Sequence, residues 1–520
     1  MSAVAGQGAS AASGAEQVAE VAHAVADAAA SGFEFTSRAQ RSGWLRALAA
    51  ALEADRGQLL AIARIETHLS EARLDGEISR TAAQLRFFAD VALEGSYLEA
   101  TIDSPDGALL PPRPALRRML RPLGVVAVFA ASNFPFAFSV LGNDTASALA
   151  AGCPVVVKAH PGHPELSRRV AALAVRTLAD TGAPAGCLAL VEGVDAGVAL
   201  VQHPLVSAVG FTGSTRGGRA LFDLACVRSA PIPFYGELGS LNPVVVTPAG
   251  AAADVTSIAA GLAGSFTRDG GQYCTKPGIV FIPDGAGFEA ALATALAGVV
   301  ETAPAQQLLT DGMTAAFAAG SATLAERADS EVIFGAEAGA AVGAGPGAAA
   351  AAAPVDGVGA AAVPVTSAPV VIATSAAAFT AAHDIFLEEC FGPLTVLVRY
   401  ADAASLQAAL AVLDGSLTAT IHCAPGEDVA ELAASLTRIA GRLLFNGWPT
   451  GVAIAWGQHH GGPWPSTTAS VHSSVGASAI RRWLAPIAYQ DAPASVLPPE
   501  LRDGNPLGIP RREDGRLVGA

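Results

Sequence analysis

The chain has 520 residues, which is enough for two or three domains with a large buried core. Hydrophobic residues make up 51% and charged residues 15%, a composition typical of a globular protein. The formal net charge of −15 and the lack of a long basic run exclude a nucleic-acid-binding surface as the main function.

The six cysteines are widely spaced, and the N-terminus has neither the basic region nor the apolar region of a signal peptide. In a chain of this size we therefore expect reduced thiols rather than three disulfides, and a cytoplasmic location.

The first hundred residues predict helices, because apolar residues recur there at helical spacing. Val18, Val21 and Val25 form one such face, and Trp44, Leu48 and Leu52 form another. Residues 104–122 differ, since they are proline-rich and basic with few helix signals, and we expect a projecting hairpin there.

From about Gly124 onward, short apolar runs such as "PVVVK" and "GIVFI" alternate with helical segments. This alternation predicts βαβ units and a parallel sheet with helices on both faces. Residues 123–142 carry no charge and are long enough to span a membrane, but Asn133 and Pro135 interrupt them. We expect a buried strand, a turn and a helix start here. The Ala/Gly-rich residues 335–365 predict a surface loop.

Cys274 lies in "RDGGQYCTKPG", where glycines give the backbone freedom and Arg268 and Lys276 supply positive charge nearby in the sequence. A catalytic thiol needs a positive field or a nearby base, because only a few per cent of an ordinary thiol is ionised at neutral pH. The alternative is an inert cysteine in a glycine-rich turn.

Two further polar residues lie next to short apolar runs that predict strands. Asn133 comes after "VVAVFA", where its amide could stabilise an oxyanion, although a turn asparagine is equally compatible. Glu237 lies between glycines in "YGELGS" and is either a general base or a capping group.

Residues 209–221, "VGFTGSTRGGRAL", predict a strand, a turn and a helix whose first amides suit a pyrophosphate. Lys158 ends a predicted strand, where it could hold a ribose or a phosphate. His160, His163, His459 and His460 have no acidic or cysteine partner at zinc-site spacing, so we predict no metal site.

Taken together, these segments resemble the aldehyde dehydrogenase superfamily. The order of Asn133, Lys158, the Gly-Ser-Thr turn, Glu-Leu-Gly, Gly-Gln-x-Cys and Glu-x-Phe-Gly-Pro is the order found in that family. Within it, segments such as "LPPELRDGNPLGI" resemble the α-ketoglutaric semialdehyde (2,5-dioxovalerate) dehydrogenase branch.

The resemblance implies a role for each motif. Cys274 would attack the aldehyde carbon, Asn133 and the Cys274 amide would hold the oxyanion, and Glu237 would activate the water that hydrolyses the thioester. Cofactor-binding residues would be Lys158 at the adenosine ribose, Gly213, Ser214 and Gly218 at the pyrophosphate, Glu389 at the nicotinamide ribose, and Phe391.

The resemblance also implies the architecture: an α/β fold of two doubly wound parallel-sheet domains with a bridging hairpin. The dinucleotide-binding domain would span residues 1–240, interrupted by the hairpin at 104–122, and the catalytic domain residues 241–445. Residues 446–520 would form a return segment and a tail that contacts another subunit in a homodimer or homotetramer.

Pro161 stands where many NAD-preferring relatives have a glutamate, so we expect NADP, with NAD tolerated. The expected substrate is a carboxylated semialdehyde, α-ketoglutaric semialdehyde, with Arg268 or Lys276 as candidate contacts for its carboxylate. Two alternatives remain: an NADP-dependent dehydrogenase of medium- or long-chain aldehydes, and a non-catalytic dinucleotide-binding relative.

Overall fold

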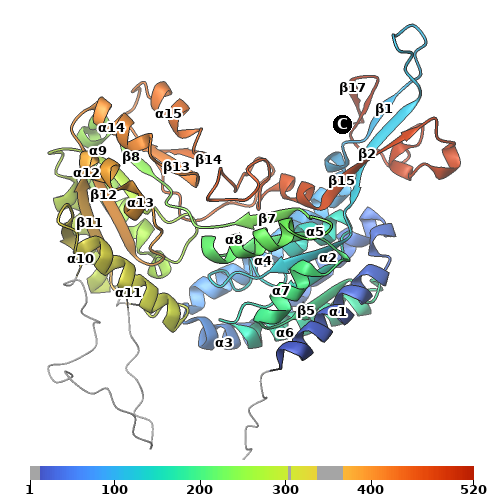
Figure 1. Ribbon diagram of the computed structural model, residues 1–520, viewed down its shortest axis with the longest axis horizontal. Helices are drawn as coiled ribbons and strands as arrows, with labels where there is room; N and C mark the ends of the chain where they lie inside the picture. The colour runs from blue at the N-terminus through green and yellow to red at the C-terminus, as the bar shows by residue number, and fades with distance from the viewer. Residues whose placement is uncertain (1–11, 303–305, 336–366, 520) are drawn as a thin grey trace, which may run out of the picture.

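The computed structural model describes residues 12–302, 306–335 and 367–519, and its strands form three sheets (Figure 1). Most of the Ala/Gly-rich segment predicted as a surface loop, residues 336–365, lies outside the described residues. No described helix combines the length and apolar character that crossing a membrane requires.

The first sheet has five parallel strands in the order β5-β4-β3-β6-β7. Their bounds are β3 Val125–Phe129, β4 Val155–Lys158, β5 Leu188–Val191, β6 Val206–Thr212 and β7 Phe234–Glu237. The chain moves outward from β3 to β5 and then returns to place β6 on the other side of β3. Ligands of such sheets bind outside the carboxyl ends of the strands, at the point where this order reverses.

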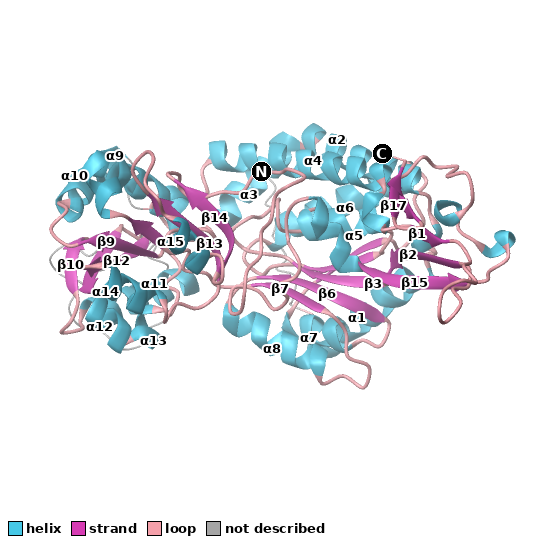
Figure 2. Ribbon diagram, turned by 90° about the horizontal axis from the view of Figure 1, so that it is seen from above, coloured by secondary structure: helices cyan, strands magenta, loops and turns pink. Residues whose placement is uncertain are grey.

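Helices cover both faces of this sheet, as its apolar strands predict (Figure 2). One face packs on α1 (Gly14–Ala30), α7 (Val194–Gln202) and α8 (Thr215–Cys226). The other face packs on α5 (Asn143–Ala151) and α6 (Pro164–Asp180), and α2 (Arg38–Ala54), α3 (Arg56–Thr67) and α4 (Glu71–Glu94) pack on these two helices.

The helical faces predicted near the N-terminus are largely buried. Trp44, Leu48 and Leu52 belong to the core. Val21 and Val25 are buried as well, but Val18 is 47% exposed, because the apolar face of α1 meets the sheet only one turn later. The uncharged segment 123–142 contains β3, which is the predicted buried strand. The predicted helix, α5, begins at Asn143, directly after the last residue of the segment.

The second sheet has seven strands in the order β10-β11-β12-β9-β8-β13-β14, all parallel except β10. Their bounds are β8 Val244–Val246, β9 Ile279–Pro283, β10 Glu331–Phe334, β11 Val370–Ser375, β12 Leu394–Tyr400, β13 Ser416–His422 and β14 Ala440–Phe445. α9 (Pro248–Phe266) and α10 (Phe288–Thr302) cover one face. The other carries α11 (Asp311–Ala325), α12 (Ala376–Ala381), α13 (His383–Phe386), α14 (Ala403–Leu410) and α15 (Ala430–Leu436).

A third sheet contains the predicted hairpin. β1 (Thr101–Asp103) pairs antiparallel with β2 (Leu116–Pro122), and the loop between them projects from the body of the molecule (Figure 1). C-terminal strands complete this sheet on both sides: β15 (Leu484–Gln490) lies beside β2, and β16 (Arg511–Glu513) with β17 (Arg516–Val518) lies beside β1.

A buried ion pair attaches the segment that follows β14 to the first sheet. Arg482 donates to the Asp144 carboxylate on α5 at 2.6 Å, and both side chains are almost fully buried. The neighbouring Trp483 donates its indole N–H to Ser147 at 2.8 Å. These contacts bring residues 446–483 back over the first sheet after the chain has completed the second.

We predict that Arg482→Met lowers the thermal midpoint of this part of the molecule by about 10 °C, because the Asp144 carboxylate would remain buried without its partner. Arg481→Met is the matched control, since Arg481 is 51% exposed and pairs with Glu99 at the surface. It should change the midpoint by about 2 °C or less. Calorimetry of the two variants checks this, and equal shifts would contradict it.

Candidate active site

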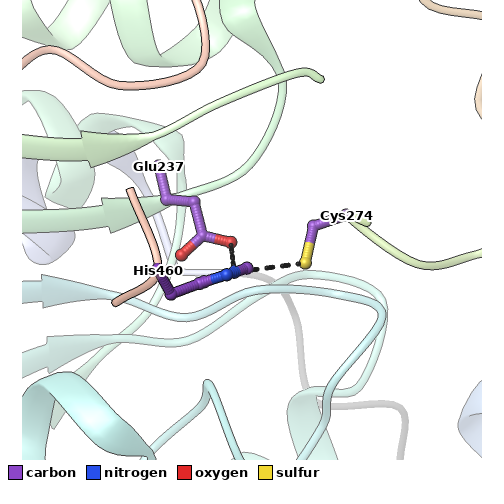
Figure 3. Close-up of side chains that lie close together, drawn as sticks. All are labelled: Glu237, Cys274 and His460. Atoms are coloured by element: carbon purple, nitrogen blue, oxygen red, sulfur yellow. Dashed lines mark hydrogen bonds and ion pairs between the residues drawn. The ribbon is translucent and has the colours of Figure 1, made fainter. Parts of the chain in front are cut away.

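Three segments that are far apart in the sequence meet beside the first sheet (Figure 3). Glu237 is the last residue of β7, Cys274 lies in the loop before β9, and His460 belongs to the segment that returns after β14. The His460 ring lies between the other two side chains.

One ring nitrogen makes both contacts. His460 Nε2 lies 2.9 Å from Glu237 Oε1 and 3.5 Å from the Cys274 sulfur. The second carboxylate oxygen of Glu237 accepts a hydrogen bond from the Ser474 hydroxyl at 2.5 Å. Glu237 and His460 are buried, whereas Cys274 is partly exposed between buried neighbours. The cysteine residue thus keeps some exposure, while the carboxylate and the imidazole beside it are shielded from water.

The loop that carries Cys274 is held from two sides. The buried Asn242 side chain donates to the carbonyls of Cys274 and Lys276, each at 2.9 Å. On the other side Gly271 has a φ of +70°, and a side chain at this position would lie 2.4 Å from the Gly392 carbonyl. The predicted need for backbone freedom and close approach in this loop is therefore met by Gly271.

Asn133 lies against the same loop. Its side-chain amide Nδ2 donates to the backbone carbonyl of Gln272, two residues before the cysteine, at 3.0 Å. The backbone carbonyl of Asn133 accepts a hydrogen bond from Arg73. One N–H of a side-chain amide suffices for the contact with Gln272, so the Asn133 amide keeps a second donor.

The buried carboxylate and thiol have opposite pKa shifts. Burial would raise the pKa of Glu237, but the charge and hydrogen bond of His460, with the Ser474 hydrogen bond, outweigh it and lower the pKa overall. Burial raises the pKa of the Cys274 thiol well above its ordinary value, and the negative charge of Glu237 raises it further. Glu237 is therefore ionised at neutral pH, and the thiol needs a base to ionise.

The predicted phosphate-binding residues follow β6 at the carboxyl edge of the first sheet. Ser214 caps α8 by accepting a hydrogen bond from the Gly217 amide at 3.2 Å. Gly213 and Ser214 are exposed, and Gly218 is buried inside the helix. Lys158 ends β4 at the same edge, where burial lowers its pKa. The exposed N-terminus of α8 suits a pyrophosphate.

Glu389 and Thr215, the first residue of α8, line one cavity of about 210 Å³ together with Gly239 and Gly415. A side chain at position 239 would collide with the Glu389 carboxylate and the Thr215 hydroxyl, so the glycine keeps this space open. Burial raises the pKa of Glu389 to about 7, although Lys276 lowers it. The open space, the carboxylate and the helix N-terminus fit a dinucleotide. Phe391 follows on the same loop and is partly buried.

The two predicted substrate contacts occupy different environments. Arg268 is exposed, with its guanidinium carbon 5.8 Å from the centre of the Tyr273 ring. Lys276 is 2% exposed and donates to the carbonyls of Cys390 and Leu394 at 3.0 and 2.8 Å. These bonds give the Lys276 ammonium a structural role instead of the predicted contact with a substrate carboxylate.

Sequence reasoning missed His460 at this site. The sequence shows it only as half of the adjacent pair His459 and His460, which lacks a partner at zinc-site spacing. It is 186 residues from Cys274 and 223 from Glu237, so no local spacing connects the three. Its position in the glycine-rich "GQHHGG" was the available signal, because glycines often mark close approach at a functional site.

The same three side chains could also hold a metal ion. The Glu237 oxygen, the Cys274 sulfur and the His460 nitrogen all lie within 4.8 Å of one another. The same short distances are required when a thiol nucleophile is hydrogen-bonded to a base and the base to a carboxylate. The prediction that the protein has no metal site therefore remains a prediction.

Comparison with known proteins identifies relatives over almost the whole chain. The sequence model described as "Aldehyde dehydrogenase family" matches residues 6–478. Alpha-ketoglutaric semialdehyde dehydrogenase 2 of Azospirillum brasilense is 43% identical, over 92% of this chain and 87% of the relative. Alpha-ketoglutaric semialdehyde dehydrogenase of Acinetobacter baylyi is 37% identical, over 94% of this chain and 89% of the relative.

Solved structures with the same fold are more distant in sequence. A 3,6-anhydro-L-galactose dehydrogenase in complex with NADP superposes with a TM-score of 0.73 at 21% identity and covers 91% of both chains. A putative aldehyde dehydrogenase from Burkholderia cenocepacia superposes with a TM-score of 0.72 at 22% identity. The superposition covers 91% of this chain and 92% of the Burkholderia chain. These similarities confirm the predicted fold class.

The electrostatics of the site predict how Cys274 reacts with iodoacetamide. The rate should still be rising above pH 9, because the pKa of this thiol is raised. Glu237→Gln removes a negative neighbour and should therefore lower the pKa and speed labelling at pH 8 by up to about tenfold. Labelling followed peptide by peptide, with the exposed Cys226 as the internal reference, measures this. A slower reaction in the variant would contradict the assignment.

Proposed function

Because this chain belongs to the aldehyde dehydrogenase family, we propose that it oxidises α-ketoglutaric semialdehyde to 2-oxoglutarate through a covalent bond to Cys274. NAD(P)-dependent aldehyde oxidation follows from the family. The substrate is supported by the names of two relatives that match nearly the whole chain. The contact of one His460 nitrogen with both Cys274 and Glu237 carries the assignment of the catalytic residues.

The reaction begins with ionisation of the thiol. The thiol proton passes to His460 Nε2 as the proton that Nε2 shares with Glu237 Oε1 moves to that carboxylate, which releases it to solvent before the hydrolysis step. The sulfur then bonds to the aldehyde carbon, and the carbonyl oxygen becomes an oxyanion. The Asn133 amide and the backbone N–H of Cys274 stabilise this charge.

Collapse of the oxyanion turns the carbon into a hydride donor and leaves a thioester on Cys274. NAD(P), when bound, supplies the hydride acceptor. Lys158, the α8 N-terminus at Gly213, Ser214 and Gly218, and Glu389 are the residues that would hold it, with Phe391 on the same loop as Glu389. The cavity between Thr215 and Glu389 supports this assignment.

Hydrolysis of the thioester completes the reaction. Glu237 takes a proton from a water molecule as the water oxygen bonds to the acyl carbon, and the thiolate leaves as the carboxylic acid forms. The lowered pKa of Glu237 keeps this carboxylate ionised at neutral pH, ready to accept the proton. His460 and Ser474 fix its orientation.

NADP is the proposed cofactor, with NAD tolerated. Position 161, after the end of β4, holds proline rather than a carboxylate that would repel a 2′-phosphate. The negative charge of Glu192 interacts with the Lys158 ammonium. This negative charge is offset by Arg168, which donates hydrogen bonds to both Glu192 oxygens at 2.7 and 2.8 Å. The ribose end of the site is therefore suited to an anionic group.

The hairpin of residues 104–122 and the C-terminal tail, which share a sheet, join subunits in a homodimer or homotetramer. An enzyme for neutral medium- or long-chain aldehydes would use the same catalytic residues and differs only in its substrate preference. A non-catalytic relative is disfavoured by the hydrogen-bonded Cys274, His460 and Glu237.

A kinetic panel tests the proposed function. With NADP, kcat/KM for α-ketoglutaric semialdehyde should exceed that for pentanal, an uncharged aldehyde of the same carbon number. Cys274→Ala should abolish both activities, because no other group can form the covalent intermediate. Similar values for the two aldehydes would favour the neutral-aldehyde alternative, and near-normal turnover by Cys274→Ala would refute the mechanism.

Glu237→Gln should separate the two halves of the reaction. Hydride transfer needs no water, so we expect a burst of about one NADPH per active site, followed by turnover slowed on the order of 10²- to 10⁴-fold. Stopped-flow absorbance with enzyme in micromolar amounts measures both phases. Loss of the burst with folding intact would show that Glu237 acts before hydrolysis.

A further inference from the structure

Two arginines near Cys274 are held by backbone carbonyls rather than by carboxylates. Arg80 lies on α4 and Arg442 on β14, and both are partly buried. The positive charge of each guanidinium interacts electrostatically with the Cys274 side chain. Within the described ranges, no carboxylate lies at ion-pair distance from either guanidinium. A partly buried cation that no carboxylate contacts is costly unless a ligand completes it.

Arg80 has a donor to spare. Its Nη1 donates to the carbonyl of Val452 at 2.8 Å, and its Nε donates to Gln84 at 3.1 Å. Its Nη2 is buried and has no hydrogen-bond partner among the described residues. Arg73, two turns earlier on the same helix face, differs because Glu77 and Asp269 both pair with it, at 3.2 and 3.1 Å.

Glu77 does not satisfy Arg80, although its charge reaches that guanidinium. One Glu77 oxygen accepts from the backbone amides of Phe136 and Ala137, each at 2.9 Å, and the other faces Arg73. Among the described residues, no ion pair therefore neutralises the positive charge on the Nη2 side of Arg80.

A short chain of contacts connects Arg80 to the nucleophile. The loop of residues 449–452 accepts from Arg80 at Val452 and from Arg442 at Pro449 and Gly451. The amide of Gly451 donates to the hydroxyl of Thr275, the residue after Cys274, at 3.2 Å. Two guanidiniums thus hold a loop that itself contacts the cysteine segment.

The Phe134 ring lies near this cation and also near Arg73, whose guanidinium carbon is 4.4 Å from the ring centre. Phe134 follows Asn133 in the sequence, and its ring centre is 6.0 Å from the guanidinium carbon of Arg80. Phe134 packs edge-to-face on Tyr273, the residue before the cysteine. An apolar wall of this kind suits the methylene carbons of a substrate that has an aldehyde at one end and a charge at the other.

We propose that Arg80 binds the carboxylate of the aldehyde substrate through its unpartnered Nη2, with Arg442 adding positive charge and bracing the loop beside it. This inference rests on the proposed function, since it assumes that the aldehyde reacts at Cys274. It assigns the substrate class as oxo-carboxylates and replaces Arg268 and Lys276 as the carboxylate contact. A charge-assisted hydrogen bond of this kind gives affinity and fixes which end of the substrate faces the sulfur.

The test compares Arg80→Met with the wild type on carboxylated and neutral aldehydes. For α-ketoglutaric semialdehyde and succinic semialdehyde, kcat/KM should fall about 10- to 100-fold more than for pentanal, because only the carboxylates lose a charge-assisted bond. Arg80→Lys keeps the charge and should recover part of the preference. The matched control is Arg86→Met on the same helix, whose side chain is 41% exposed and pairs with Glu53. Equal losses on all three aldehydes would overturn the proposal.

A second measurement does not depend on turnover. Glutarate should slow iodoacetamide labelling of Cys274 in the wild type and in Arg86→Met, and this protection should weaken at least tenfold in Arg80→Met. Equal protection in all three proteins would overturn the role of Arg80. If the wild type oxidises succinic semialdehyde but not α-ketoglutaric semialdehyde, the proposed substrate is wrong, while the difference between Arg80→Met and Arg86→Met still decides the carboxylate contact.

Discussion

The contact of His460 Nε2 with both the Cys274 sulfur and the Glu237 carboxylate is the constraint on which the rest of the structure depends. It requires the end of the first sheet, the loop before β9 and the returning segment to meet at one point. The returning segment has almost no regular structure around His460, so its position is set by contacts elsewhere. The buried pair of Arg482 with Asp144 and the burial of Trp483 provide those contacts. A fold-stabilising interaction thus also positions the base beside the nucleophile.

Charges of both signs act on the sulfur. Glu237 raises the pKa of the thiol, while Arg80 and Arg442 place positive charge within reach of it. The negative charge suits proton transfer and water activation. The positive charges suit an anionic substrate end. One site can therefore combine a general base with the carboxylate-binding group that we propose.

The loops that carry the cysteine and Glu389 are packed directly against each other. Gly271 approaches the backbone of Gly392, and the buried Lys276 ammonium bonds to carbonyls on both sides of that glycine, at Cys390 and Leu394. Lys276 also lowers the pKa of Glu389, although burial keeps it raised at about 7. The nucleophile and the proposed ribose-binding carboxylate are therefore held in a fixed relation by the buried Lys276.

The sequence by itself determined the parallel sheets, the hairpin and the motif residues, because these depend on local apolar periodicity and on short patterns such as those around Cys274, Glu237 and Asn133. Only the tertiary structure decided which polar residues share a site. His460 is 186 residues from the thiol, and Arg80 and Arg442 lie on a helix and a strand with no motif of their own. Lys276, adjacent to the motif, is buried on backbone carbonyls instead of facing substrate. The physical reason is that a side chain's partners are set by packing between distant segments, which local sequence patterns do not encode.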